Sequence, residues 1–320
     1  MILVTGANGF IGQALCEELQ IRNRKHKGVV RKIDSEKSKQ NFAIGNIDSD
    51  TDWSNTLMGV DCVIHCAART HIMHEKNKNT LEAYRAINVE GTRQLAIQAA
   101  SSGVKRLIYI SSIKVNGEGV NIPSKKKSIS ESGRKITHMD APTPKDSYSI
   151  SKWEAEQLLW DISTKTGLEI VIIRPPLVYG PRVKGNLSRL LNLINLGIPL
   201  PFGFIKNKRS LIGLDNLTDL LIHCVDHPSA SGRTFLVSDD EDISTPDLLN
   251  YIAKGLGRSV LLLPVPVTIL NLFGIIIGKR EEIDRLTGSF QIDSYYTRKT
   301  LGWFPNVSVE EGLRRMVKTK

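Results

Sequence analysis

The fold is decided at the start of the chain by the stretch Ile2-Leu3-Val4-Thr5-Gly6-Ala7-Asn8-Gly9-Phe10-Ile11-Gly12. A short apolar strand runs straight into a glycine-rich turn, and the turn opens a helix. Glycines at these positions permit a tight turn and a close approach of the backbone, so a pyrophosphate can rest on the N-terminus of the helix. The stretch therefore predicts a dinucleotide site with contacts from Gly6, Asn8, Gly9, Phe10, Ile11 and Gly12.

The rest of the N-terminal half alternates apolar, β-branched runs with segments of helical periodicity, which is typical of βαβ units around a parallel sheet. Strands are expected at 28–31, 42–44, 62–64, 106–110 and 169–173, and helices at 10–22, 80–102 and 146–166. After Pro175 short helices, prolines and isolated strands predominate. The predicted fold class is α/β: a doubly wound parallel Rossmann sheet over residues 1–175, and a smaller C-terminal α+β lobe over 176–320 that sends some segments back to the sheet.

Composition and charge narrow the class of protein. The chain of 320 residues carries a formal net charge of +10, but it has no zinc-finger spacing and no stacking pattern of aromatic and basic residues. We therefore expect no nucleic-acid partner, and favour a basic surface that attracts anionic substrates. The four cysteines show no CxxC pair and no metal-ligand spacing, so no metal site is expected and a reduced, cytoplasmic location is favoured. Met1 leads directly into the first strand, which leaves no room for a signal peptide.

One segment, Val260 to Gly278, contains no charged residue. A membrane span needs roughly 20 apolar residues in one helix, and Pro264 and Pro266 interrupt this one. The pattern favours a strand at Leu261-Leu262-Leu263 followed by an apolar helix from about Thr268, either buried or in a subunit interface. Membrane contact is less favoured, and a peripheral contact of this segment is the minority alternative.

The end of the second strand bears on the choice of cofactor. About 20 residues beyond the glycine turn, a site for NAD usually carries an acid for the ribose 2′-hydroxyl. This chain has Val30-Arg31-Lys32 there, and the nearest acid is Asp34. Because a cation suits a 2′-phosphate, Arg31 favours NADP, with NAD or dual use as the alternative.

A second motif carries acid–base chemistry. Tyr148-Ser149-Ile150-Ser151-Lys152 places a phenol and an ammonium four residues apart, on one face of a helix. A nearby cation favours the phenolate, so Lys152 is expected to lower the pKa of Tyr148 towards neutrality. The fifth strand ends in Ser111-Ser112, at the edge of the sheet where doubly wound folds bind ligands.

The turn, the serines and the YxxxK motif, in this order, resemble the extended short-chain dehydrogenases/reductases, a family of nucleotide-sugar epimerases, dehydratases and reductases. The resemblance covers essentially the whole chain, and it implies a catalytic triad of Ser112, Tyr148 and Lys152. Tyr148 would exchange a proton with the oxygen on C4 of the sugar, and Ser112 would hydrogen-bond that oxygen. Lys152 would hold the nicotinamide ribose, so Tyr148 and Lys152 also count as cofactor contacts. The resemblance further suggests a homodimer.

Other matching positions are Asn46, Ile47 and Ala67 for the cofactor, and Asn186, Arg209 and, more weakly, Arg285 for the diphosphate of a UDP-sugar substrate. Asn88 matches a structural asparagine of the family, and His65 is interpreted as a packed strand-end residue. Three positions depart from the family: Asn46 replaces an aspartate, Asn116 replaces the tyrosine of Val-Tyr-Gly, and Leu177 replaces an asparagine near the sugar. The sugar pocket is thus expected to differ from that of a typical glucose/galactose epimerase.

The segments Ser111 to Glu118 and Arg174 to Pro181 resemble bacterial O-antigen and capsule enzymes that act on UDP-N-acetylhexosamines. Two activities fit the triad. A 4-ketoreductase would form UDP-N-acetylquinovosamine from the 4-keto-6-deoxy sugar and consume NADPH, whereas a UDP-sugar 4-epimerase would retain NAD. Arg31 and the altered pocket favour the reductase. A non-catalytic NADP-binding sensor is a third possibility, against which the intact triad argues.

Overall fold

The computed structural model describes residues 1–33, 41–70, 80–117 and 134–318. Seven parallel strands form one sheet in the order β3-β2-β1-β4-β5-β6-β9. Their bounds are β1 Ile2–Thr5, β2 His26–Val30, β3 Phe42–Ala43, β4 Cys62–His65, β5 Arg106–Ile110, β6 Glu169–Arg174 and β9 Arg233–Leu236. The strand order reverses beside β1, and the crevice at such a point is where doubly wound sheets bind dinucleotides. The predicted fold class is confirmed.

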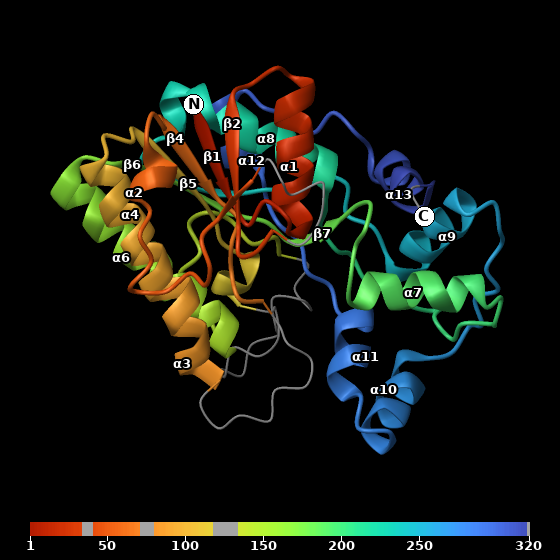
Figure 1. Cartoon of the computed structure of the whole chain (residues 1–320). Helices are drawn as coiled ribbons and strands as arrows, with labels where there is room; N and C mark the ends of the chain where they lie inside the picture. The colour runs from red at the N-terminus through yellow and green to blue at the C-terminus, as the bar shows by residue number, and fades with distance from the viewer. Residues whose placement is uncertain (34–40, 71–79, 118–133, 319–320) are drawn as a thin grey trace.

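Helices cover both faces of the sheet (Figure 1). On one face α1 (Phe10–Ile21) and α8 (Leu214–Asp226) pack on Val4 and Ile64, and on the other face α2 (Ser54–Leu57), α4 (Thr92–Ser101) and α6 (Ser147–Thr166) pack on Leu3 and Val63. Because successive side chains of a strand point to opposite faces, one continuous apolar run supplies both cores.

The helix expected over 80–102 is interrupted. It consists of α3 (Thr80–Arg85), a π-helix (Ala86–Gly91) and α4. The π segment contains Asn88, which is 1% exposed, and Gly91, where a Cβ atom would stand 2.6 Å from Cγ2 of Ile47. Such π segments are rare and often occur at functional sites.

A second lobe follows β6 and lies to the right of the sheet in Figure 1. Its elements are β7 (Leu177–Tyr179), α7 (Asn186–Asn195), β8 (Leu211–Gly213), α9 (Thr245–Gly255), α10 (Val267–Ile276), α11 (Arg280–Thr287) and α13 (Val309–Lys318). Between them α8 and β9 return to the sheet, and α12 (Tyr295–Leu301) packs beside β9. The lobe has its own apolar core, which includes Leu190, Leu249 and Leu313.

Of the expectations for the segment 260–278, the strand is wrong, and so is the buried one of the two alternatives for the helix. The strand at Leu261–Leu263 reduces to one isolated bridge between Leu200 and Leu262. Helix α10 forms as expected, but it is not a buried helix, because Leu272 is 60% and Ile276 is 72% exposed. A helix that is apolar all round has no polar side to show which face is covered, so the pattern alone suggested burial. Within the described residues no helix combines the length and the apolarity that a membrane span requires.

Candidate active site

The glycine turn is packed too closely for side chains. Gly6 has a φ of +65°, the amide of Gly9 donates to the carbonyl of Gly6 over 2.8 Å, and a Cβ atom at Gly12 would lie 2.2 Å from that same oxygen. The result is a bare backbone cradle before α1, where the free amides of the first helical turn face outward. A bare backbone of this kind fits the pyrophosphate of a dinucleotide.

The structure brings Ala67 against this turn. A Cβ atom at Gly6 would lie 3.0 Å from the backbone nitrogen of Ala67, which donates to Oγ1 of Thr5 over 3.1 Å. His65 lies between two hydroxyls, with Nδ1 2.7 Å from Oγ1 of Thr5 and Nε2 3.1 Å from Oγ1 of Thr92. Burial, with a smaller effect of the nearby Lys152 charge, lowers the pKa of His65 to about 3, so this histidine is a neutral packed residue.

Arg31 and Asn46 also lie close to each other, at the end of β2. The amide of Gly45 donates to the carbonyl of Arg31 over 3.1 Å, and both Arg31 and Asn46 are exposed. Ile47 is half-buried and packs on the core beneath α4. Asp34, the nearest acid in sequence, lies outside the described residues.

The two serines after β5 have different partners. Ser111 is buried and its hydroxyl donates to Oε1 of Glu156. Ser112 caps a short 3₁₀ helix (Ile113–Asn116) and accepts from the amide of Lys114 over 3.3 Å. Its hydroxyl lies close enough to Tyr148 to lower the pKa of that phenol, against the larger effect of burial. Ser112, rather than Ser111, is therefore the serine that shares a site with Tyr148.

Tyr148 sits in the first turn of α6, whose start is fixed by a capping box. Asp146 accepts from the amide of Ser149 over 2.6 Å, and Lys114 donates to Oδ2 of Asp146 over 2.9 Å. The turn that carries Ser112 and the helix that carries Tyr148 are thus tied together by Lys114 and Asp146. This tie was not predicted from the sequence, although Asp146-x-x-Ser149 is a recognisable helix-start pattern.

The ring of Tyr148 contacts Tyr84 edge-on, with centroids 6.1 Å apart. Burial, with a smaller contribution from Asp146, raises the pKa of Tyr148 above its usual value. The shift is therefore opposite to the lowering expected from Lys152, because desolvation of the phenolate dominates.

Lys152 lies one turn further along α6 and is 2% exposed. Its Nζ donates to the carbonyl of Ile110 over 2.8 Å and lies 4.4 Å from the ring centroid of Tyr109. Burial lowers the pKa of Lys152 to about 7, against the opposing effect of Glu156, whose carboxylate favours the charged form. A lysine with a pKa near neutrality responds readily to a new partner, as a catalytic lysine must.

Behind these residues lies a fully buried polar network. Arg174 makes a two-point ion pair with Glu156, which is 0% exposed, and its Nη1 donates to Oδ1 of Asn116 over 2.9 Å. Asn116 in turn donates to the carbonyl of Asp140 over 3.0 Å. Asn116, the residue that replaces the family's tyrosine, is therefore a structural link between β6 and the chain that leads into α6.

In the second lobe the structure brings Arg209 and Arg285 together. Nη1 of Arg209 donates to the carbonyl of Arg285 over 2.7 Å and to that of Gly288 over 3.0 Å. Arg285 is exposed at the end of α11, and Asn186 is exposed at the start of α7. The contact thus joins the Arg209 side chain to the backbone of Arg285, whose own guanidinium lies 3.6 Å from the carboxylate of Glu281. Arginine side chains are suited to a diphosphate.

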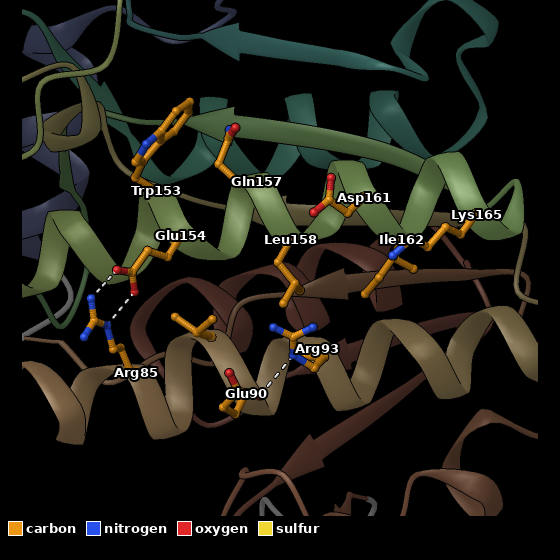
Figure 2. A pocket seen from close by; sticks show the side chains of 11 residues that line it. Arg85, Glu90, Arg93, Trp153, Glu154, Gln157, Leu158, Asp161, Ile162 and Lys165 are labelled. Carbon is orange, nitrogen blue, oxygen red and sulfur yellow. Dashed lines mark hydrogen bonds and ion pairs between the residues drawn. The ribbon is translucent and has the colours of Figure 1, made fainter.

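A separate groove of about 500 Å³ lies on the outer side of α6, away from the glycine turn. Figure 2 shows its charged residues, which include the ion pairs of Arg85 with Glu154 and of Glu90 with Arg93. Its floor contains Val89, Leu158 and Ile162. This groove contains none of the triad.

A model of the NAD dependent epimerase/dehydratase family matches residues 2–238. The chain belongs to this family. Within the family it is 43% identical over 98% of its length, and 93% of the relative's, to a UDP-glucose 4-epimerase of Vibrio cholerae. It is 26% identical over 84% of its length to an N-acetyl-α-D-glucosaminyl-diphospho-ditrans,octacis-undecaprenol 4-epimerase of Escherichia coli O157:H7, covering 77% of that protein.

The epimerase/dehydratase fold extends over the whole chain. A crystal structure of UDP-glucuronic acid 4-epimerase from Bacillus cereus, in complex with NAD, superposes with a TM-score of 0.77 at 22% identity, covering 99% of this chain and 97% of that one. The family assignment is thereby confirmed, and the chain is an enzyme of this NAD-dependent class.

Proposed function

We propose that this enzyme is a UDP-sugar 4-epimerase that retains NAD, with UDP-glucose and UDP-galactose as its first substrate pair. The observation that carries the proposal is that Ser112 lies beside Tyr148 at the carboxyl end of β5, one helical turn from Lys152. The sequence favoured the 4-ketoreductase over the epimerase, but the relative at 43% identity supports the epimerase.

The proposed roles follow from the geometry. Bound NAD supplies the chemistry of taking a hydride from C4 and returning it to either face of the sugar. Tyr148 takes the proton of the 4-hydroxyl and gives it back, and Ser112 donates a hydrogen bond to the same oxygen. Lys152 would hold the nicotinamide ribose, and its positive charge would stabilise the phenolate of Tyr148. The glycine cradle and Ala67 hold the pyrophosphate side of NAD, and Arg209 and Arg285 hold the UDP diphosphate.

The experiment is a cofactor-free assay. Purified enzyme, with no nucleotide added, is incubated with UDP-galactose, and UDP-glucose is measured by chromatography; UDP-N-acetylglucosamine is tested in parallel. We expect conversion in both directions and tightly bound NAD in the denatured protein. Activity only on UDP-4-keto-6-deoxy-N-acetylglucosamine with NADPH, followed at 340 nm, would show a reductase instead.

The variant Tyr148→Phe distinguishes a catalytic epimerase from a protein that only binds the cofactor. The variant keeps the ring and its contact with Tyr84 but lacks the proton, so we expect bound NAD to remain and turnover to fall at least 10²-fold. Glu154→Gln, on the outer side of the same helix, is the control and should keep both. Unchanged turnover in Tyr148→Phe would contradict the proposed mechanism.

A second candidate is a sugar diphosphate carried by a polyprenol, the substrate class in the name of the E. coli relative. The exposed apolar side chains of α10 favour it, because such a substrate resides in a membrane. It would use the same triad and the same two arginines. Adding the lipid-linked sugar in detergent to the assay above tests it directly.

We also propose that the enzyme is a homodimer. The two copies would meet at the groove of Figure 2, which lies on the π-helix, α4 and α6. Its apolar floor is edged by both signs of charge, among them Arg93, Lys165, Glu90 and Asp161, as a self-complementary twofold contact requires. Sedimentation velocity should show a dimer that Arg93→Glu weakens. Lys105→Glu, a reversal at an exposed site outside the groove, should leave it intact.

A further inference from the structure

Helix α10 carries an apolar strip on its outer face. Ile269, Leu272, Phe273 and Ile276 are spaced by three and four residues, so they share one side of the helix, and they are 55%, 60%, 59% and 72% exposed. We call these four residues the α10 strip. Side chains of this kind are normally covered, and an exposed cluster of them marks a surface that meets another apolar phase.

The orientation of the strip is fixed by the opposite face of the helix. Leu270 is 6% exposed, and a Cβ atom at Gly274 would lie 2.8 Å from Cγ1 of Ile283 on α11. Because α10 is packed this closely on α11, it cannot rotate to hide the strip. In Figure 1 the α10–α11 pair forms the end of the second lobe that is farthest from the N-terminus.

Neighbouring loops add to the apolar surface. Leu261 and Leu263, in the loop that leads into α10, are 62% and 41% exposed. That loop pairs with the segment before β8 through the hydrogen bond from the amide of Gly203 to the carbonyl of Leu263, over 2.9 Å. Phe204, the next residue, is 54% exposed.

The charged residues around the strip are predominantly basic. Segments 196–210 and 256–290, which contain the strip and its loops, hold seven lysines and arginines and three acids, all three acids on α11. Lys279 and Arg280 follow the strip directly and are exposed. Apolar side chains beside such cations are the pattern of helices that lie in a membrane interface, where cations meet the phosphates of anionic lipids.

We propose that the α10 strip docks the enzyme on an anionic phospholipid surface, with Lys279 and Arg280 at the lipid phosphates. The arrangement is peripheral, since no described helix is long and apolar enough for a span. A second copy of the chain fits this surface less well, because the predominantly basic residues around the strip would then face those of the other copy. The proposal does not depend on which sugar is epimerised.

Flotation with vesicles tests the proposal on the full chain. We expect binding to vesicles of phosphatidylethanolamine and phosphatidylglycerol, weak binding to phosphatidylcholine alone, and loss of binding as salt is raised. Ile276→Gln should weaken binding about tenfold or more. Ile21→Gln is the matched control, because Ile21 on α1 is 73% exposed but lies outside the strip.

The basic residues are tested separately. Lys279→Gln/Arg280→Gln should lower binding to the anionic vesicles and flatten its salt dependence, while Lys105→Gln, at a site 78% exposed on the main sheet domain, should not. Thermal unfolding of each variant confirms that it is folded. Equal weakening by Ile276→Gln and Ile21→Gln overturns the proposal, as does an absence of vesicle binding. So does a dimer in sedimentation velocity that Ile276→Gln dissociates, which would assign the strip to a second copy.

Discussion

Arg174 and Glu156 form a two-point ion pair in the protein interior, next to Ser111, which directly precedes the serine beside Tyr148. Oε1 of Glu156 also accepts from Ser111, so this single carboxylate joins β5, α6 and β6. The pair thus connects the segment that carries Ser112 to the helix that carries Tyr148. We expect it to keep these two residues at a fixed separation.

Removing one member of this pair leaves a buried charge without its partner. Glu156→Ala should therefore lower the free energy of unfolding by about 3–5 kcal/mol, measured by urea denaturation. Glu154→Ala on the same helix breaks the exposed pair with Arg85 and should cost far less, because exposed ion pairs contribute little to stability. Equal losses in the two variants would contradict a structural role for the buried pair.

Substitution of Asn116 tests whether the buried polar network around Arg174 and Glu156 also supports catalysis. Asn116→Ala removes the acceptor of Arg174 and the donor to Asp140, and should lower the free energy of unfolding by about 1–3 kcal/mol. We expect kcat to fall while KM changes little, because the loss displaces the Ser112 turn rather than the diphosphate site. Asn116→Asp keeps the acceptor and should recover most of the stability; if it does not, the bond to Arg174 is not what matters.

The buried histidine gives the fold a pH dependence. The pKa of His65 is about 3 in the folded protein against an ordinary value of 6.5, so between these values the unfolded chain binds one proton more. From His65 alone, stability should rise with pH across this window, by up to about 1.4 kcal/mol per pH unit, and be lost as the pH falls. In His65→Gln that part of the slope should disappear from urea titrations between these limits. An unchanged slope would show that other groups cause it.

The close packing of the glycine cradle predicts that a side chain at Gly12 impairs cofactor binding. Ala at position 12 would place Cβ 2.2 Å from the carbonyl oxygen of Gly6, so the turn must open. Gly12→Ala should lose bound NAD, as measured by absorbance of the denatured supernatant. Gln13→Ala, the next residue of α1, should retain it, and a Gly12→Ala variant that purifies with full NAD would disprove the assigned cradle.

Arg31 decides the tolerance for a 2′-phosphate. It is exposed at the end of β2, where it is free to reach that phosphate. Arg31→Ala should weaken NADP binding about tenfold and leave NAD binding unchanged, as measured by calorimetry on protein stripped of nucleotide. A parallel loss for both nucleotides would mean that Arg31 contacts the shared part of the cofactor.

The sheet and the site differ in how much the sequence could reveal. Continuous apolar runs such as Ile170 to Ile173, separated by helical periodicity, determine a parallel sheet almost alone, and the glycine turn fixes where it starts. The meeting of Ser112 with Tyr148 was also predictable, because both follow from strand ends and helix starts at one edge.

Contacts between distant side chains were not predictable in this way. Nothing in the pattern around Glu156 shows that its carboxylate faces Arg174, since position on a helix gives the face but not the partner. For the same reason the sequence left α10 as either a buried helix or part of a subunit interface. Its apolar composition is compatible with either a covered or an open face, and only the packing of Gly274 on Ile283 determines which side is outward.

The π-helix at Ala86–Gly91 makes the enzyme intolerant of changes in length there. Each residue of a helix turns the chain by about 100°, so deleting one residue between α3 and α4 would rotate the two helices relative to each other by that amount. Tyr84 on α3 would then lose its ring contact with Tyr148, whereas Thr92 on α4 would keep its hydrogen bond with His65. We expect substitutions in this segment to be survivable, but insertions and deletions of a single residue to abolish activity while the sheet still forms.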